Sequence, residues 1–131
     1  MPIFPLNTDG IDIWGRNFTI RRVKTTNWDD SIVAKPSNLG GAIATCTQDI
    51  LVEDCTSVFG IGMTIGSVPP NENHACIRNV HFKNIEMDYP IKAIYVKSNP
   101  GEHGDGIIKN ITYENFVIKN PLWWTIYIGP Q

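Results

Sequence analysis

The apolar residues of this chain follow the alternation of β-strands rather than the spacing of helices. Runs of four to six residues, rich in Val, Ile, Thr, Tyr and Phe, alternate with polar residues and are separated by Asn, Gly and Pro. Such runs, bounded by turn-forming residues, predict short strands. Helix pairs would need amphipathic segments of about ten residues or more, and Pro, Gly and β-branched residues interrupt every such window. We therefore expect an all-β protein.

The apolar runs repeat with a nearly constant period along the chain. One strand position recurs at Phe18, Ile50, Val80 and Ile111, in successive steps of 32, 30 and 31. A second recurs at Ile32, Met63, Ile94 and Ile126, in successive steps of 31, 31 and 32. Short strands on a fixed period predict a parallel β-helix, in which each coil stacks on the next at roughly 4.8 Å and buries columns of apolar side chains. We expect about four to five coils, forming a single domain over residues 1–131.

The laps of this repeat differ in length. The first lap, from Ile11 to Ile32, is clearly shorter than the others. The later laps carry an added apolar segment, at Ala42-Ile43-Ala44, His74-Ala75-Cys76 and Ile107-Ile108. These segments predict a third strand in each of the later coils.

Composition narrows the classes of function. The 131 residues are 42% apolar, which suffices for one core, and the net charge of −2 is mixed along the chain and does not favour nucleic-acid binding. No apolar run is long enough to span a membrane, and the first five residues do not form a signal peptide. The three cysteines fit no metal-binding spacing; one disulfide is possible, but we expect three buried thiols at Cys46, Cys55 and Cys76.

Two acidic residues fall on the same repeated position. Asp9 and Asp30 are separated along the chain by the same step as Ile11 and Ile32, so stacking would make the two acids vertical neighbours. Like charges at short range raise the proton affinity of one partner, as a general acid near neutral pH requires. The alternative is that these acids cap tight turns by accepting backbone N–H bonds.

The parity of the strands predicts which side chains face outward. If Ile32 and its column point into the core, the outward rows contain Tyr95, Tyr127, Lys35 and Lys97, together with Val33 and Thr64. Aromatic rings can cover the apolar faces of sugar rings, and lysines can pair with carboxylates, so this face would suit a glycan-binding groove. The alternative is a solvated sheet face with cross-strand packing of tyrosines.

Four motifs of this chain, in this order, resemble the signatures of glycoside hydrolase family 28, the polygalacturonases and related pectinases. They are Asn7-Thr8-Asp9-Gly10, Asp29-Asp30, the glycine-rich segment Gly60–Ser67, and Tyr95-Val96-Lys97. The resemblance covers nearly the whole chain and implies a right-handed parallel β-helix. It also implies that the chain is the central portion of a longer domain, because family members have more coils.

The resemblance implies hydrolysis of a polysaccharide with inversion, without a cofactor or a metal. In this chemistry one acid protonates the leaving oxygen while carboxylates across the scissile bond activate water. Carried over by motif, Asp29 would be the general acid, and Asp9 and Asp30 would hold and deprotonate the water. Lys97 would bind substrate.

Two departures from the family pattern weaken the expectation of activity. Ile61 stands where the family has histidine, and Tyr95 stands where it has arginine, whose bidentate grip on a carboxylate a phenol does not replace. We therefore expect an altered substrate. A buried ion pair from Lys97 or Lys35 into the acids would argue for an inactive site.

Three functional hypotheses remain open: an altered polysaccharide hydrolase, a glycan-binding module with a vestigial site, and a structural subunit that stacks end to end with itself or another β-helix. We expect a polysaccharide partner, no nucleic acid, no membrane, and a secreted location. Two N-x-Thr sequons, at Asn17 and Asn110, would suit a secreted glycoprotein, but Asn17, Asp49, Asn79 and Asn110 share one turn of successive laps, which explains them as turn-forming residues.

Overall fold

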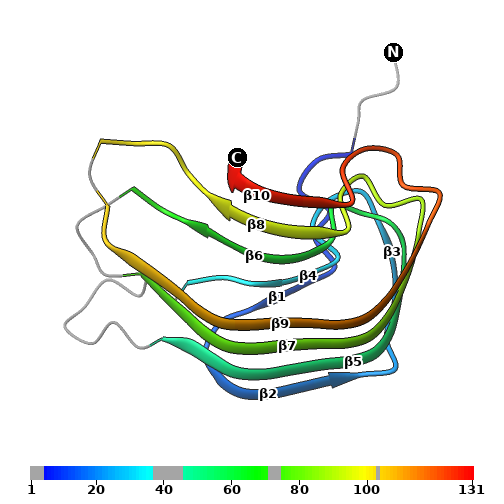
Figure 1. Cartoon of the computed structure of the whole chain (residues 1–131), viewed down its shortest axis with the longest axis horizontal. Coiled ribbons are helices and arrows are strands. Elements are labelled where there is room, and N and C mark those ends of the chain that lie inside the picture. The colour runs from blue at the N-terminus through cyan, green and yellow to red at the C-terminus, as the bar shows by residue number, and fades with distance from the viewer. Residues whose placement is uncertain (1–4, 37–45, 71–74, 103) are drawn as a thin grey trace.

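The computed structural model describes residues 5–36, 46–70, 75–102 and 104–131, and the secondary structure in these ranges consists of strands. All strand pairs are parallel, and they form two sheets (Figure 1). Within the described ranges, no helix is long and apolar enough to cross a membrane. The prediction of an all-β, parallel fold is confirmed.

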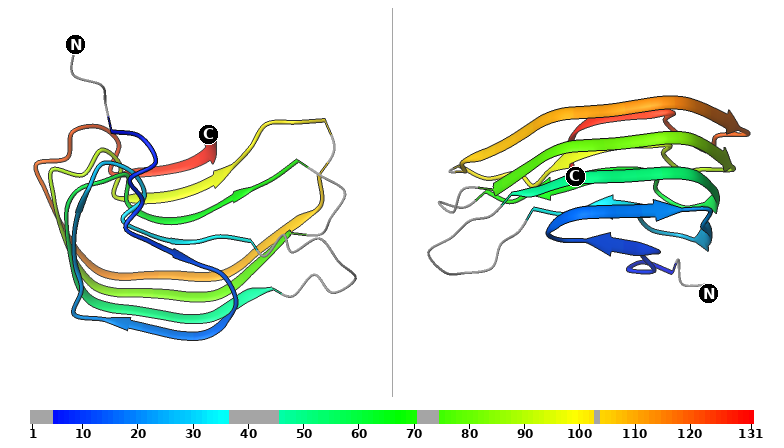
Figure 2. Two further views of the ribbon diagram at one scale, coloured as in Figure 1. Left: turned by 180° about the vertical axis from the view of Figure 1, so that it is seen from behind. Right: turned by 90° about the horizontal axis from the view of Figure 1, so that it is seen from below.

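Successive coils contribute neighbouring strands to each sheet. Sheet A has the order β1-β4-β6-β8-β10 and consists of β1 (Ile11–Ile13), β4 (Ile32–Ala34), β6 (Met63–Val68), β8 (Ile94–Ser98) and β10 (Ile126–Pro130). Sheet B has the order β2-β5-β7-β9 and consists of β2 (Arg16–Arg21), β3 (Lys24–Asn27), which also pairs with β5, β5 (Thr47–Phe59), β7 (Ala75–Asp88) and β9 (Gly106–Lys119). Figure 2 shows the coils rising in chain order, from β1 and β2 to β9 and β10. This is a parallel β-helix.

The register of the strands agrees with the repeat in the sequence. Ile32 lies opposite Met63, Met63 opposite Ile94, and Ile94 opposite Ile126. In sheet B, Phe18, Ile50, Val80 and Ile111 form one column. A parallel ladder keeps equivalent residues in line, so a repeat of apolar residues along the chain becomes a stack of apolar residues in space.

The core lies between the two sheets. Its central members are almost completely buried, among them Ile32, Met63 and Ile65 from sheet A and Val52 and Phe82 from sheet B. The Phe82 ring stacks on the Tyr113 ring of the next coil, with centroids 5.0 Å apart. Because each coil buries its apolar face against the coils beside it, the core is continuous along the stack.

Asparagine and aspartate residues bend the long strands of sheet B. Asp49, Asn79 and Asn110 have positive φ angles of 59°, 54° and 55°, which Asn and Asp tolerate better than most residues. The Asn79 amide donates to Asp49 over 2.9 Å, and the Asn110 amide donates to Asn79 over 3.1 Å. The three residues therefore share one position of successive coils, as predicted, but they bend continuous strands instead of forming a turn between strands.

The added apolar segments do not form separate strands. Ala75-Cys76 begin β7, and Ile107-Ile108 follow the first residue of β9; each strand continues past the bend within the same sheet. The prediction of a third strand is therefore wrong at these two places. Ala42-Ile43-Ala44 and His74 lie outside the described residues.

A disulfide bond links two consecutive coils. Cys46 and Cys76 are bonded, with Cα atoms 4.5 Å apart and a sequence separation of 30 residues. One lap of the chain therefore brings the second cysteine directly beside the first. Cys55 is free and buried, and burial raises the pKa of its thiol. The expectation of three thiols was wrong for Cys46 and Cys76 and correct for Cys55.

Candidate functional site

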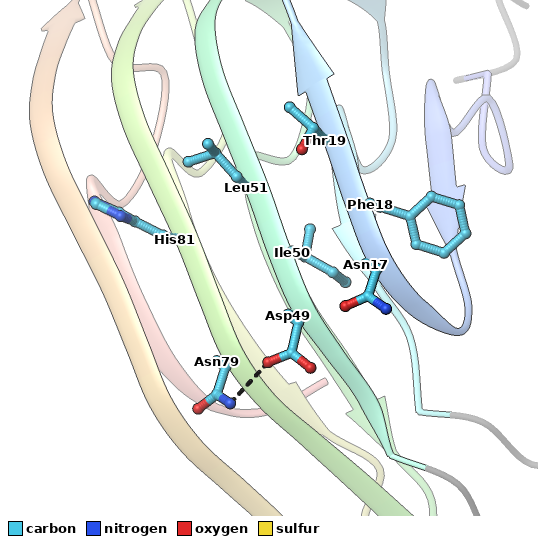
Figure 3. A pocket seen from close by; sticks show the side chains of 8 residues that line it. All are labelled: Asn17, Phe18, Thr19, Asp49, Ile50, Leu51, Asn79 and His81. Atoms are coloured by element: carbon cyan, nitrogen blue, oxygen red, sulfur yellow. Dashed lines mark hydrogen bonds between the residues drawn. The ribbon is translucent and has the colours of Figure 1, made fainter.

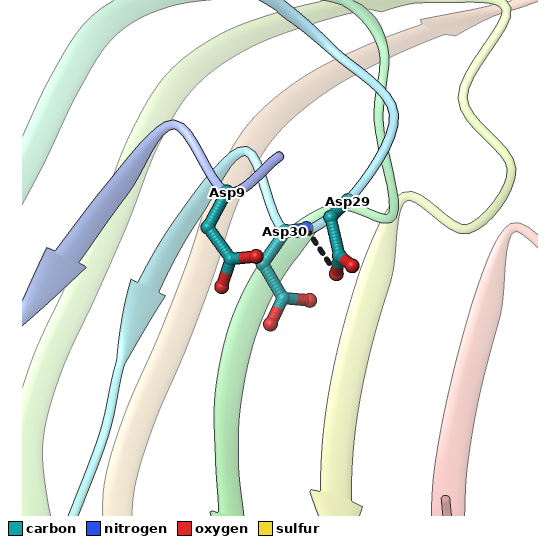
Figure 4. Close-up of side chains that lie close together, drawn as sticks. All are labelled: Asp9, Asp29 and Asp30. Carbon is teal, nitrogen blue, oxygen red and sulfur yellow. Dashed lines mark hydrogen bonds between the residues drawn. The ribbon is translucent and has the colours of Figure 1, made fainter. Parts of the chain in front are cut away.

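Three aspartates enter the site from the ends of neighbouring coils. Asp9 precedes β1, while Asp29 and Asp30 precede β4. The Gly10 amide donates to the Asp30 carbonyl over 2.9 Å, which places the two turns one above the other. Figure 4 shows the three side chains gathered at the start of β1 and β4, on the outer side of sheet A.

The three carboxylates lie close together. Asp9, Asp29 and Asp30 each offer an oxygen atom within 4.8 Å of the other two. They line a cavity of about 320 Å³ whose wall is almost entirely polar. The other lining residues are Asn7, Lys35, Ser67, Lys97, Asn99 and Gln131. The predicted stacking of the acids is therefore present, and the cavity that they line opens onto solvent.

Asp29 is held by the backbone and remains only partly buried. Its two oxygens accept hydrogen bonds from the Asn7 amide at 2.9 Å and from the Asp30 amide at 2.8 Å. Both donors are main-chain groups that a ligand does not displace easily. Asp29 is therefore a fixed carboxylate at the wall of the cavity.

Asn27 fixes the turn that carries Asp29 and Asp30, and the sequence analysis missed it. It is buried, and its side-chain amide donates to the carbonyls of Thr8, Asp29 and Asp30 at 3.0, 2.8 and 2.9 Å. One side chain thus ties together the turns before β1 and β4. In the sequence, the place of Asn27 just ahead of the Asp29-Asp30 pair could have indicated this turn-fixing role.

Asp30 is the most buried of the three acids. Its carboxylate accepts a hydrogen bond from Thr64 Oγ1 at 2.9 Å and pairs with Lys97 Nζ at 2.7 Å; the side chains of Asp30 and Lys97 are 1% and 8% exposed. Burial raises the pKa of Asp30, while Lys97 and Thr64 lower it. The direction agrees with the sequence analysis, but the main cause is burial, and repulsion from Asp29 contributes least.

Lys35 joins a second set of carboxylates. Its ammonium lies 3.0 Å from Asp9 and 2.9 Å from Asp12. Burial raises the pKa of Asp12, and contact with Lys35 opposes this. Burial lowers the pKa of Lys35, but its bonds to Asp12 and Asp9 outweigh this, so the net shift is upward. Asp12 is a fourth acid of the site that the sequence analysis did not single out.

The residues predicted to bind substrate are brought together, but several are covered. Val33, Thr64, Tyr95 and Tyr127 form one row of sheet A, as predicted. Val33, Thr64 and Tyr95 are 0%, 0% and 3% exposed, while Tyr127 is partly exposed. Three of the four residues of the row therefore offer no open groove, and Lys35 and Lys97 are engaged by the acids.

Ile61, which stands where the resembled family has histidine, takes part in the site through its backbone amide. The Ile61 amide donates to the Asp29 carbonyl over 2.8 Å, and the Ile61 side chain is partly exposed. The polar partners of Asp30 come instead from Thr64 and Lys97, on β6 and β8.

A second hollow lies on the outer side of sheet B (Figure 3). It encloses about 490 Å³ and is lined by Asn17, Phe18, Thr19, Asp49, Ile50, Leu51, Asn79 and His81. Hydrogen bonds from Asn79 and Gln48 lower the pKa of Asp49, and His81 Nε2 lies 2.9 Å from Glu114. Asp49 is the one acidic residue among those that line the hollow, which therefore lacks the converging acids of the first site.

Fold and site together define a β-helix protein with a carboxylate-lined cavity on the outer face of one sheet. The chain belongs to the glycosyl hydrolases family 28, whose family model matches residues 5–129. This confirms the resemblance found in the motifs.

Three similar proteins come from Aspergillus species. The chain is 33% identical over 111 residues to a protein of Aspergillus flavus named probable rhamnogalacturonase C, covering 85% of this chain and 21% of that protein. It is 34% identical over 117 residues to a probable endo-xylogalacturonan hydrolase A of the same species, covering 87% and 26%. It is 33% identical over 119 residues to a probable exopolygalacturonase C of Aspergillus terreus, covering 89% and 25%. This chain thus spans about a quarter of the length of these relatives. No solved structure matches it.

Proposed function

We propose that this chain carries the acid cluster of a polygalacturonase-like glycoside hydrolase that acts on a pectin-type polysaccharide. The observation that carries the proposal is the meeting of Asp9, Asp29 and Asp30, with oxygens within 4.8 Å, at an open polar cavity in a member of family 28. Keeping three acids this close costs electrostatic energy, which a purely structural turn would not require.

The proposed roles follow the accessibility of each acid. Asp29, fixed by two backbone amides at the cavity wall, would protonate the leaving oxygen. Asp9, partly exposed and paired on one oxygen with Lys35, would hold and deprotonate the water. Asp30 would act with Asp9 by keeping charge beneath the reacting water, because its side chain is only 1% exposed and is paired with Lys97, whereas Asp29 is partly exposed.

Inversion is part of the proposal and is open to direct measurement. Inverting enzymes separate their carboxyl groups by roughly 6.5–9.5 Å and retaining enzymes by roughly 5–5.5 Å. The nearest oxygens here lie within 4.8 Å. The anomer released in the first minutes of reaction, followed by NMR, would distinguish the two outcomes.

The proposal is tested by incubating the chain with pectic and neutral polysaccharides and measuring new reducing ends. Asp29→Asn should reduce any rate by at least about a hundredfold, the scale of general acid catalysis. Asp49→Asn is the matched control, because asparagine already occupies this position in neighbouring coils at Asn79 and Asn110. A rate that survives Asp29→Asn would refute the assignment of the general acid.

A glycan-binding module without turnover is the second candidate. It is favoured by the buried Lys97–Asp30 ion pair and by the Lys35 contact with Asp9, which commit two acids to internal cations. It predicts that calorimetry detects polysaccharide binding, that no reducing ends appear, and that Asp29→Asn leaves the affinity unchanged.

We also propose a secreted location. The Cys46–Cys76 disulfide supports it, because disulfides persist in oxidising compartments.

A further inference from the structure

Lys92, which neither the sequence analysis nor the proposed chemistry uses, lies within a cluster of aromatic rings. Its ammonium is 3.8 Å from the Tyr95 ring centroid, 4.4 Å from Tyr127 and 5.6 Å from Trp123. Trp124 stacks on Trp123 at 4.3 Å and on Tyr127 at 4.9 Å. An ammonium over several ring faces is attracted by each of them, and this holds Lys92 in place.

This aromatic cluster is continuous with the acid cluster. Lys97 Nζ is 2.7 Å from Asp30 and 5.1 Å from the Tyr95 ring on which Lys92 rests. The register of the turns also places Lys92 one coil beyond Ile61 and two coils beyond Asp30, since Ser31 N donates to Gly62 O and Met63 N donates to Ala93 O. Both clusters therefore lie along one line across the strands of sheet A.

The three lysines of this face differ in their partners. Lys97 is bound to Asp30, and Lys35 is bound to Asp9 and Asp12. Lys92 is partly exposed and forms no ion pair with a carboxylate among the residues that the structure describes. Burial, followed by the charge of Lys97, lowers its pKa, and the more distant charge of Asp30 only partly opposes this.

The charge of Lys92 restricts what can occupy this surface. Trp123 and Trp124 are 58% and 44% exposed beside the ammonium. An apolar protein segment placed over them would strip water from an unpaired cation, which is costly. An anionic ligand with an apolar face would instead pair with the cation and cover the rings.

We propose that Lys92, Tyr127 and Trp124 form a subsite for a uronic acid unit of the polysaccharide, with the sugar ring on the aromatic faces and its carboxylate on Lys92. The inference rests on the proposed function for the class of ligand. Lys92, in the turn before β8, would also place a cation near Tyr95, the residue that stands where the family has arginine. The glycan would then run across the strands from the acids toward β10.

The test compares an oligogalacturonate with the same oligosaccharide after reduction of its carboxyl groups, using calorimetry on the full chain. Lys92→Met, which keeps the apolar stem, should weaken binding of the acidic probe about tenfold and leave the reduced probe unchanged. Lys92→Arg should restore the affinity. Trp124→Ala should weaken both probes. Lys109→Met, an exposed lysine of sheet B, is the control and should change neither.

Equal binding of the acidic probe by Lys92→Met and the unchanged protein would overturn the subsite, as would an equal loss for both probes. Self-association in light scattering that Trp124→Ala abolishes would also overturn it, because a second copy would then cover the cluster. The binding measurements are repeated in Asp29→Asn. Lys92-dependent binding, with no release of reducing ends by the protein that retains Asp29, would refute the hydrolase and support the subsite, so the two failures are distinguishable.

Discussion

The buried ion pair between Lys97 and Asp30 should control the stability of the fold, and its removal is the sharpest test of this structure. In Lys97→Met the apolar stem stays and the charge is lost, leaving a carboxylate that is 1% exposed with Thr64 as its remaining side-chain partner. Breaking a buried pair from one side costs about 3–5 kcal/mol. For a domain of this size that corresponds to a fall in the unfolding midpoint of roughly 10–20 °C at neutral pH.

The loss should depend on pH in a defined direction. The pKa of Asp30 is already raised in the fold, chiefly by burial, and Lys97 is the main group that opposes this. A raised pKa favours folding below the unfolded value of 3.8 and loses that contribution as pH rises through the folded value. In Lys97→Met the pKa rises further, so the deficit should grow with pH and shrink on acidification, where Asp30 is neutral.

Thermal unfolding followed by circular dichroism between pH 4 and pH 8 measures both effects. Adding Asp30→Asn to Lys97→Met removes the unpaired charge and should restore most of the lost stability at neutral pH. Lys119→Met is the control, because its contact with Glu86 is exposed and its loss should leave the midpoint unchanged. A deficit that is the same at every pH, or a double variant as unstable as the single one, would contradict the reasoning.

Two further perturbations test how the coils are held together. Cys76→Ser should lower the free energy of unfolding by about 3.6 kcal/mol, the chain-entropy value for a closed loop of about 30 residues. Urea denaturation with and without reductant measures this loss. If reductant leaves the stability of the original chain unchanged, the disulfide bond is not present. Gly66→Ala should cost about 1–3 kcal/mol, because Gly66 has φ +108° and a Cβ there would meet the Lys97 carbonyl. At Gly129, which is paired with Lys97 from the neighbouring coil, an added Cβ meets only ordinary contacts, so Gly129→Ala should be tolerated.

The stacking of the coils was predictable because the repeat carries the register. The interval between Ile32 and Met63 fixes which residues face each other, and parallel pairing then sets the column of Val33, Thr64, Tyr95 and Tyr127. The same reasoning placed Asp9 beside Asp30. Parity gives the face of a residue but says nothing of what covers it. The burial of Thr64 under the Asp30 carboxylate therefore had to come from the structure.

Other features depend on contacts that no periodic pattern encodes. The pairing of Cys46 with Cys76 depends on where the chain re-enters sheet B, although their separation of 30 residues is one lap and could have been noticed. Lys92 lies in the turn before β8, outside the alternating strand, so parity assigned it no face. Its cluster arises from side chains of two coils meeting in space.

The balance of charge around the acid cluster sets a condition on any acidic substrate. Asp9, Asp12, Asp29 and Asp30 surround two ammonium groups, Lys35 and Lys97, so the cluster carries a net negative charge when every acid is ionised. A polyanionic glycan would be repelled there. Burial raises the pKa of both Asp12 and Asp30, so acidification neutralises these two before it would neutralise exposed aspartates. The repulsion thus weakens as pH falls, while Lys92 stays charged, so the proposed binding of an acidic sugar chain should strengthen on acidification, which calorimetry at a series of pH values measures.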